Sequence, residues 1–293
     1  MRRWIIQGLL FVIGFTAVER FCHKQTHGFR LQKIQADLPH NSDWETLLPG
    51  DHEIRIIQSI LSQPYYFLAC GGESYAFVSD DGKYVLKFFK LHHMRPKNLS
   101  DAFLPTFFRE KVQKQRIKKL STLFSSCLLA YERFREKTGL VYLHLNQTDN
   151  LHLDCKLFDA IGAKHSLNFD QIPFALQERA SMAYPTLSAL TEARELDAAK
   201  KRLGSLVDLI VARCAVGLSD HDARKRNFGF VGEKAVEIDI GSFTIDEMLK
   251  TPLETKKVLM HETLKLRRYI KKRHPELIDF LDKKLNSYLS EKT

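Results

Sequence analysis

Residues 217–243 read GLSDHDARKRNFGFVGEKAVEIDIGSF, and the rest of the chain is interpreted around this segment. Asp222 and Asn227 lie five residues apart in a part of it that is too charged and irregular to be a buried element. The run that follows predicts two short strands joined by a tight turn, and such a hairpin would return Asp239 to the neighbourhood of Asn227. An amide oxygen and a carboxylate brought together suit a hard cation such as Mg²⁺, which leaves Asp222 to orient a hydroxyl or a water.

The composition is that of a globular protein. The 293-residue chain is 44% hydrophobic and 11% aromatic, which excludes a disordered or fibrous protein and allows one large domain or two lobes. Its formal charge of +10 favours anionic partners such as nucleotide phosphates, nucleic acid or an anionic membrane surface. The five cysteines are scattered without CxxC spacing, so we expect reduced, mostly buried thiols rather than a disulfide framework or a zinc site.

Residues 1–20 predict a hydrophobic anchor or signal segment. Two arginines precede residues 4–18, which contain no charge and fall short of the ~20 residues that cross a bilayer untilted. No small-x-small cleavage site follows, so the first interpretation is a short, uncleaved transmembrane helix, and the second is an apolar helix docked on the domain. This predicts a membrane-associated or exported protein that contacts the membrane through residues 4–18, with the side of the membrane left open.

The remaining residues predict a linker and two lobes. The linker covers 21–50, a β-rich N-terminal lobe covers 51–178, and a helical C-terminal lobe, which contains the loop with Asp222 and Asn227, covers 179–293. Alternating apolar residues and turn signals in the first lobe predict a helix over 51–63 and strands over 65–69, 74–78, 84–89 and 172–177. The order is typical of an α+β fold with an antiparallel sheet plus a helix in one lobe and a mainly helical second lobe.

Three further segments of the chain have patterns that predict their structure or surroundings. Residues 140–160 alternate in polarity and predict a hairpin turning at Asp149 and Asn150. Residues 109–119 are strongly basic and predict a helix that faces solvent or anionic lipid head groups, whereas nucleic acid is not an expected partner. The apolar run over 203–216 predicts the central buried helix of the second lobe, and later helical patterns break at Pro252 and Pro275.

Several polar motifs follow one another in a fixed order. In chain order these are a glycine pair in a strand turn, a lysine in the third strand, a helical glutamate, a D-x-x-x-x-N loop and a D-x-G sequence after a hairpin. This order resembles the protein-kinase-like superfamily, which includes protein kinases and small-molecule kinases related to aminoglycoside phosphotransferases. The residues that carry the resemblance, all between 64 and 243, are Gly71, Gly72, Lys87, Glu132, Asp222, Asn227 and Asp239.

The resemblance implies a two-lobed phosphotransferase that uses ATP and Mg²⁺ and transfers phosphate to an alcohol group of an unknown acceptor. Lys87 would bind the nucleotide phosphates and serve catalysis, and Glu132 would pair with Lys87 and hold it in place. Glu110 and Glu136 are alternatives to Glu132. The glycine pair would let backbone amides approach the phosphates closely.

The resemblance also implies the metal ligands and the base. Asn227 and Asp239 would ligate Mg²⁺, and Asp222 would orient or deprotonate the acceptor, with Asp220 as its alternative. The third glycine of the phosphate loop, the His-Arg before the loop aspartate and an Ala-Pro-Glu sequence are missing, so a conventional protein substrate is not expected. The alternative function is a catalytically inactive kinase-like domain that acts as a binding or scaffold protein tethered to a membrane.

Overall fold

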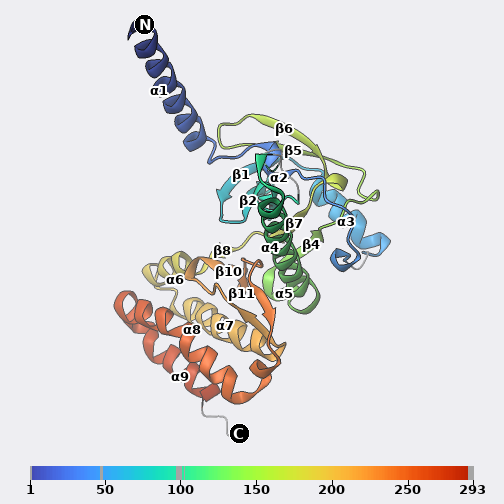
Figure 1. Cartoon of the computed structure of the whole chain (residues 1–293). Coiled ribbons are helices and arrows are strands. Elements are labelled where there is room, and N and C mark those ends of the chain that lie inside the picture. Colours follow the sequence, from blue (N-terminus) through green and yellow to red (C-terminus); the bar gives the residue numbers. More distant parts are fainter. Residues whose placement is uncertain (1, 47–48, 97–100, 102, 290–293) are drawn as a thin grey trace. The chain divides into compact units, whose positions relative to one another are not determined.

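The structure is a computed structural model that describes residues 2–46, 49–96, 101 and 103–289 (Figure 1). The chain divides into two compact units. The first unit comprises Met1–Leu120 and His144–Ala175, and the second comprises Ser121–Leu143 and Leu176–Thr293. A large sheet dominates the first unit and helices dominate the second, so the predicted α+β fold class is confirmed.

The first unit is built around the sheet. Its elements are α1 (Arg2–Gln25), α2 (Leu31–Ile34), η1 (Ser42–Trp44), α3 (Asp51–Leu61), β1 (Tyr65–Cys70), β2 (Ser74–Ser79), β3 (Tyr84–Phe89), η2 (Leu91–His93), β5 (Asp154–Phe158), β6 (Lys164–Asn168) and η4 (Phe169–Gln171). The chain passes between the units within α4 (Thr106–Arg133), β4 (Leu140–His144) and β7 (Phe174–Glu178). Over the described residues the sheet has seven strands in the order β4-β7-β3-β2-β1-β5-β6. The helix α3 and the strands β1, β2, β3 and β7 were predicted from the sequence and are confirmed.

The sheet is mixed rather than purely antiparallel. β1, β2 and β3 pair antiparallel, but β1 and β5 run parallel. In β2 every second side chain is buried, which is the pattern of a strand with one face on the core. On that face Phe77 meets Phe67 and Phe88 edge-on, with ring centres 5.7 and 5.9 Å away.

Residues 21–50, predicted to be a linker, contribute to this core. Phe29 is buried with its ring 5.2 Å from those of both Tyr75 and Phe77. The Tyr75 hydroxyl donates a hydrogen bond to the carbonyl of Gly28 at 2.8 Å. Burial of these apolar groups keeps the segment on the sheet, and Ile34, Leu38 and Trp44 are buried as well.

The hairpin predicted over residues 140–160 is wrong. β4 lies at one edge of the sheet, whereas β5 lies between β1 and β6. The carboxylate of Asp170 explains the difference, because it accepts hydrogen bonds from the amides of Asn150 (3.1 Å), Leu151 (3.0 Å) and His152 (2.9 Å). The residues expected to form a tight turn are therefore wrapped around a buried carboxylate, and the strand after them pairs elsewhere.

The prediction of a transmembrane anchor is also wrong. Among the described residues, none of the helices has the length and apolar character needed to span a membrane. The uncharged residues 4–18 would cover only about 22 Å as a helix, against a hydrocarbon core of about 30 Å. The charged residues Glu19 and Arg20 end this uncharged stretch within α1. The large apolar side chains of α1 that the structure describes, including Trp4, Phe11 and Phe15, are exposed. Contact of residues 4–18 with a membrane stays a prediction.

The second unit packs helices around α7. Its elements are the C-terminal part of α4 (Thr106–Arg133), α5 (Arg135–Thr138), β8 (Ser181–Met182), α6 (Ala183–Glu192), α7 (Leu196–Ala215), β9 (Leu218–Asp220), η5 (Lys225–Asn227), β10 (Phe228–Val231), β11 (Lys234–Glu237), β12 (Phe243–Ile245), η6 (Glu247–Lys250), α8 (Pro252–Arg273), η7 (Pro275–Leu277) and α9 (Ile278–Leu289). Contacts from α6, α8, α9 and β11 surround α7, which confirms the predicted central helix. Pro252 occupies the first turn of α8 behind the N-cap Thr251, as expected for a residue that cannot continue a preceding helix.

Candidate functional site

Residues 217–243 form a loop that is closed at its base by the two-stranded ladder of β9 and β12. Asp220 pairs with Phe243 across this ladder. Ser126 of α4 fastens the end of the loop, since its hydroxyl accepts a hydrogen bond from the Phe243 amide at 2.6 Å and donates one to the Ile240 carbonyl at 2.7 Å. Ser126 is buried, so these bonds replace water that the backbone would otherwise need.

One hydrogen bond closes the predicted catalytic loop on itself, and a second joins it to the end of the hairpin. The side-chain amide of Asn227 donates to the carbonyl of Asp222 at 2.7 Å, and the Ile238 amide donates to the carbonyl of Asn227 at 2.7 Å. β10 and β11 pair antiparallel, with Phe228 opposite Glu237, so the predicted hairpin is confirmed. Because the Asn227 nitrogen is used in this bond, its amide oxygen is the atom that a cation would bind.

Asp222 and Asp220 have different surroundings. Asp222 is half-buried and forms an ion pair with the exposed Arg224. Asp220 accepts hydrogen bonds through Oδ1 from the Asp222 amide at 2.9 Å and from the Ser242 hydroxyl. One carboxylate oxygen of each residue is thus engaged, and the choice of Asp222 over Asp220 as the group that would face an acceptor stays a prediction.

The donor chemistry near Asp239 can be compared with that of a magnesium site. Asp239 is exposed and its Oδ1 accepts a long hydrogen bond of 3.4 Å from the Gly241 amide. Over the residues that the structure describes, no group of three or more His, Cys, Asp or Glu side chains could hold a metal ion. Asn227 and Asp239 would supply one amide oxygen and one carboxylate, and Mg²⁺ bound through one or two such ligands takes its remaining ones from phosphate oxygens and water. The residues fit this chemistry, and ligation by them stays a prediction.

The glycine pair lies between β1 and β2 in the first unit. The Gly71 amide donates to the Ser74 carbonyl at 2.9 Å, which closes the turn. A Cβ added at Gly72 would meet no atom within 4 Å, so packing in this unit does not require glycine there. Both residues are exposed. Local packing therefore does not explain the glycine at position 72, and close approach of the backbone amides of this pair to phosphates stays a prediction.

Lys90, which was not predicted as a site residue, contacts this turn. Lys90 Nζ donates to the Gly71 carbonyl at 2.6 Å and lies 4.6 Å from the centre of the Tyr75 ring. Lys87 is half-buried in β3 opposite Ala76 of β2. The signal for Lys90 was the strand register, because pairing of β2 with β3 brings the end of β3 beside the turn that begins β2.

The glutamates considered as partners of Lys87 are all exposed. Glu132 lies in the last turn of α4, Glu110 near the start of the same helix, and Glu136 in α5. Glu132 belongs to the second unit and Lys87 to the first. The pairing of Lys87 with Glu132 stays a prediction.

A buried charge network beside the loop was not predicted from the sequence. Arg213 of α7 is 1% exposed and donates from Nη1 to both carboxylate oxygens of Glu237 at 2.9 Å, and from Nη2 to Glu262 of α8. Burial raises the pKa of Glu237, and Asp220 raises it further while Arg213 opposes the shift. Glu237 ends β11 two residues before Asp239, so the network holds this end of the hairpin on α7. A single arginine inside the apolar run 203–216 was the signal.

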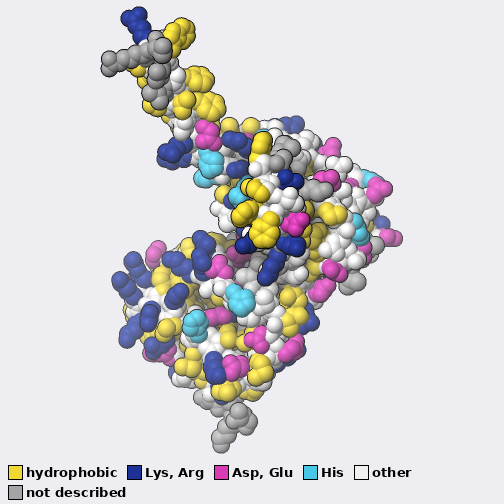
Figure 2. Space-filling model, in the orientation of Figure 1, with side chains coloured by type: hydrophobic (Ala, Val, Ile, Leu, Met, Phe, Trp, Pro, Cys, Tyr) yellow, Lys and Arg dark blue, Asp and Glu magenta, His cyan; other side chains and the backbone are white. Residues whose placement is uncertain are grey.

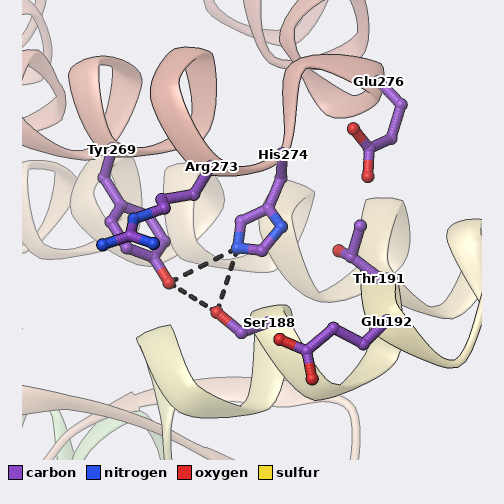
Figure 3. A pocket seen from close by; sticks show the side chains of 7 residues that line it. All are labelled: Ser188, Thr191, Glu192, Tyr269, Arg273, His274 and Glu276. Atoms are coloured by element: carbon purple, nitrogen blue, oxygen red, sulfur yellow. Dashed lines mark hydrogen bonds between the residues drawn. The ribbon is translucent and has the colours of Figure 1, made fainter.

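A separate cavity of about 430 Å³ lies in the second unit (Figure 3). The Ser188 hydroxyl lies 2.5 Å from the Tyr269 hydroxyl and 2.9 Å from Nε2 of His274, and these last two atoms are 3.4 Å apart. The cavity is lined by Ser188, Thr191, Glu192, Tyr269, Arg273, His274 and Glu276. Its central polar groups satisfy one another, and it includes no residue predicted for phosphate transfer.

Comparisons with known proteins leave the family open. No protein-family model matches the chain, and no curated protein matches it. Among solved structures, a 2.2 Å crystal structure of WbdD is 15% identical over 78% of this chain and 46% of WbdD, with a TM-score of 0.37. A co-crystal structure of WbdD with a kinase inhibitor is 16% identical over the same shares, with a TM-score of 0.33. The chain spans about half the length of WbdD, and likeness at this level carries no functional argument.

Proposed function

We propose that this chain is a magnesium-dependent phosphotransferase of kinase-like fold, with ATP as the phosphate donor and an alcohol group as the acceptor. The observation that supports it is the hydrogen-bonded connection of Asp222, Asn227 and Ile238. Through it, the D-x-x-x-x-N loop and the strand end before Asp239 form one local assembly. Phosphoryl transfer depends mainly on positioning and charge stabilisation, so a fixed loop bearing an acceptor-orienting carboxylate and two oxygen ligands suits it.

Each residue then has a separate task. Asp222 orients the acceptor hydroxyl, and Asn227 and Asp239 hold Mg²⁺ on the nucleotide phosphates. Lys87 neutralises charge on those phosphates. The half-buried setting of Lys87, between the buried Leu86 and Phe88 in β3, supports this role because a partly desolvated cation attracts phosphate more strongly than a fully hydrated one.

Calorimetric titration of the full chain with ATP tests nucleotide binding. We expect binding that requires Mg²⁺ and disappears with EDTA. Asp239→Asn should weaken it about ten- to a hundredfold, the value of a charge-assisted interaction. Asp197→Asn is the matched control, because Asp197 is a fully exposed carboxylate of the same unit. If neither Asp239→Asn nor Lys87→Met changes nucleotide affinity, the proposal is wrong.

Release of the γ-phosphate separates the proposal from its alternative. With labelled ATP, we expect slow transfer to water that Asp222→Asn abolishes while nucleotide affinity is kept, since that carboxylate acts on the acceptor and not on the nucleotide. Nucleotide binding without any transfer, in the presence of candidate alcohols, would instead support a catalytically inactive kinase-like domain.

A further inference from the structure

Helix α8 has one face on the core of the second unit and one face in solvent. Leu259, Thr263, Leu266 and Ile270 form its buried face. The opposite face follows the helical spacing of three and four residues. We call it the α8 outer face, and its exposed members are Leu253, Lys257, Met260, His261, Leu264, Lys265, Arg268, Lys271 and Lys272.

The α8 outer face exposes a row of large aliphatic side chains. Leu253 is 59% exposed, Met260 61% and Leu264 46%. Single exposed apolar residues are ordinary on soluble proteins. Here they recur at intervals of seven and four residues, so they lie along one side of the helix rather than at scattered points. A row of this kind favours a partner that takes up apolar side chains.

Cations flank this row. Residues 252–273 include eight Lys or Arg and two Glu. Among these cations, Lys257 forms an ion pair with Glu254 and Arg267 forms one with Asp282. Over the part of the chain that the structure describes, the other cations of the α8 outer face, Lys265, Arg268, Lys271 and Lys272, form no ion pair. Figure 2 shows Lys and Arg side chains gathered at the lower left, where the C-terminal end of α8 lies in Figure 1.

We propose that the α8 outer face docks on an anionic lipid surface as a peripheral contact. Helices that lie in a membrane interface combine aliphatic side chains with lysine and arginine in this way, because the chains enter the acyl boundary while the cations meet the head groups. Nucleic acid fits less well, since binding of single strands relies on aromatic stacking. The sole Phe, Tyr or Trp in residues 252–273 is Tyr269, which is half-buried and bonded to Ser188.

Three aliphatic side chains are too few to bind a neutral bilayer firmly. The proposal therefore requires charge: docking is expected on vesicles of phosphatidylcholine with phosphatidylserine, and not on phosphatidylcholine alone. It should also weaken as salt rises, because exposed charges are screened over about 10 Å at moderate ionic strength.

Vesicle co-sedimentation of the full chain tests this. The triple variant Lys265→Gln, Arg268→Gln, Lys272→Gln should bind anionic vesicles at least about tenfold more weakly. Its matched control is Lys137→Gln, Lys164→Gln, Lys234→Gln, which removes the same charge from exposed positions on other elements. The pair Met260→Ser, Leu264→Ser should weaken binding as well, with the salt dependence kept. All these residues are exposed, so the variants should fold, and circular dichroism checks this.

Helix α1 also exposes apolar side chains, so every comparison is repeated in a chain carrying Phe11→Asp and Phe15→Asp. In that background α8 is the surface under test. Equal losses in the charge variant and its control would overturn the proposal, because attraction would then depend on net charge alone. So would unchanged binding by both α8 variants, absence of binding to anionic vesicles, or preferential binding of RNA or an acidic peptide by the α8 outer face.

Discussion

Replacement of Arg213 by methionine should strongly destabilise the second unit. Arg213 is 1% exposed and supplies hydrogen bonds to Glu237, which is 0% exposed, and to Glu262, which is 11% exposed. Methionine fills much of the same space but carries no charge, so two carboxylates would stay in a buried site without their cation. Removal of one partner from a buried ion pair costs about 3–5 kcal/mol, and we expect a loss of unfolding free energy in that range.

A second variant separates lost charge from lost packing. When Arg213→Met is combined with Glu237→Gln and Glu262→Gln, no charge of the network is left buried. Uncharged replacements of a whole buried network are often neutral or stabilising, so most of the loss should be recovered. A triple variant as unstable as the single one would mean that Arg213 acts through packing.

The loss of unfolding free energy caused by Arg213→Met, called the deficit below, should depend on pH. Burial raises the pKa of Glu237, Asp220 raises it further and Arg213 opposes this, so loss of Arg213 raises the pKa again. A carboxyl group with a raised folded-state pKa adds stability below its unfolded pKa of about 4.3, and that contribution is lost as the pH rises through the folded-state value. The deficit should therefore be largest at neutral pH and shrink towards about pH 4.

Hydrogen exchange of peptides from α7 and β11 in increasing urea is the suitable measurement, since two compact units need not unfold together. A deficit below about 1 kcal/mol at neutral pH, the usual size of an average substitution, would refute the reasoning.

Three further substitutions test other parts of the fold. Asp170 accepts four hydrogen bonds from Thr148 and the amides that follow it, and although burial opposes the effect these bonds lower its pKa. Asp170→Asn should cost about 1.5–3 kcal/mol at neutral pH. Because a lowered pKa gives stability that is lost as the pH falls through it, urea titrations should show the deficit shrinking below about pH 4, and a deficit independent of pH would contradict this. Ser126→Ala leaves a buried amide and a buried carbonyl without their hydrogen-bond partner. It should lower the free energy of unfolding, measured by thermal unfolding, by about 1–3 kcal/mol. A change within about 0.5 kcal/mol would count against the role given to this hydroxyl. Gly229→Ala would set a Cβ 2.8 Å from that of Ala180 and should lower thermal stability by about 1–3 kcal/mol. In Gly50→Ala the added Cβ meets no atom within 4 Å, so this control should change thermal stability little. Equal effects of the two substitutions would refute the steric argument.

Local patterns were sufficient for most individual elements. Turn residues and alternation over 65–89 predict β1, β2 and β3, and the run after Asn227 predicts the hairpin of β10 and β11. The apolar run around Leu206 predicts α7. These signals succeed because each element is specified by residues close in the chain, whose spacing records whether one face is buried.

The candidate site divides in the same way. The five-residue interval from Asp222 to Asn227 and the following hairpin were visible in the sequence, and the bond from the Asn227 amide to the Asp222 carbonyl agrees with them. The support beneath the loop was not visible, because Ser126 meets Phe243 from 117 residues away. A hydroxyl in a helix does not indicate which distant backbone it will satisfy.

Tertiary structure decided which elements meet. Alternation identifies a strand but not its partner, so the hairpin over 140–160 was wrong, and β5 pairs with β1 and β6. Arg213 finds Glu237 and Glu262 at separations of 24 and 49 residues. Burial makes such partners obligatory, since an unpaired charge in the core is too costly to keep. Only the folded chain shows which carboxylates are close enough to pair.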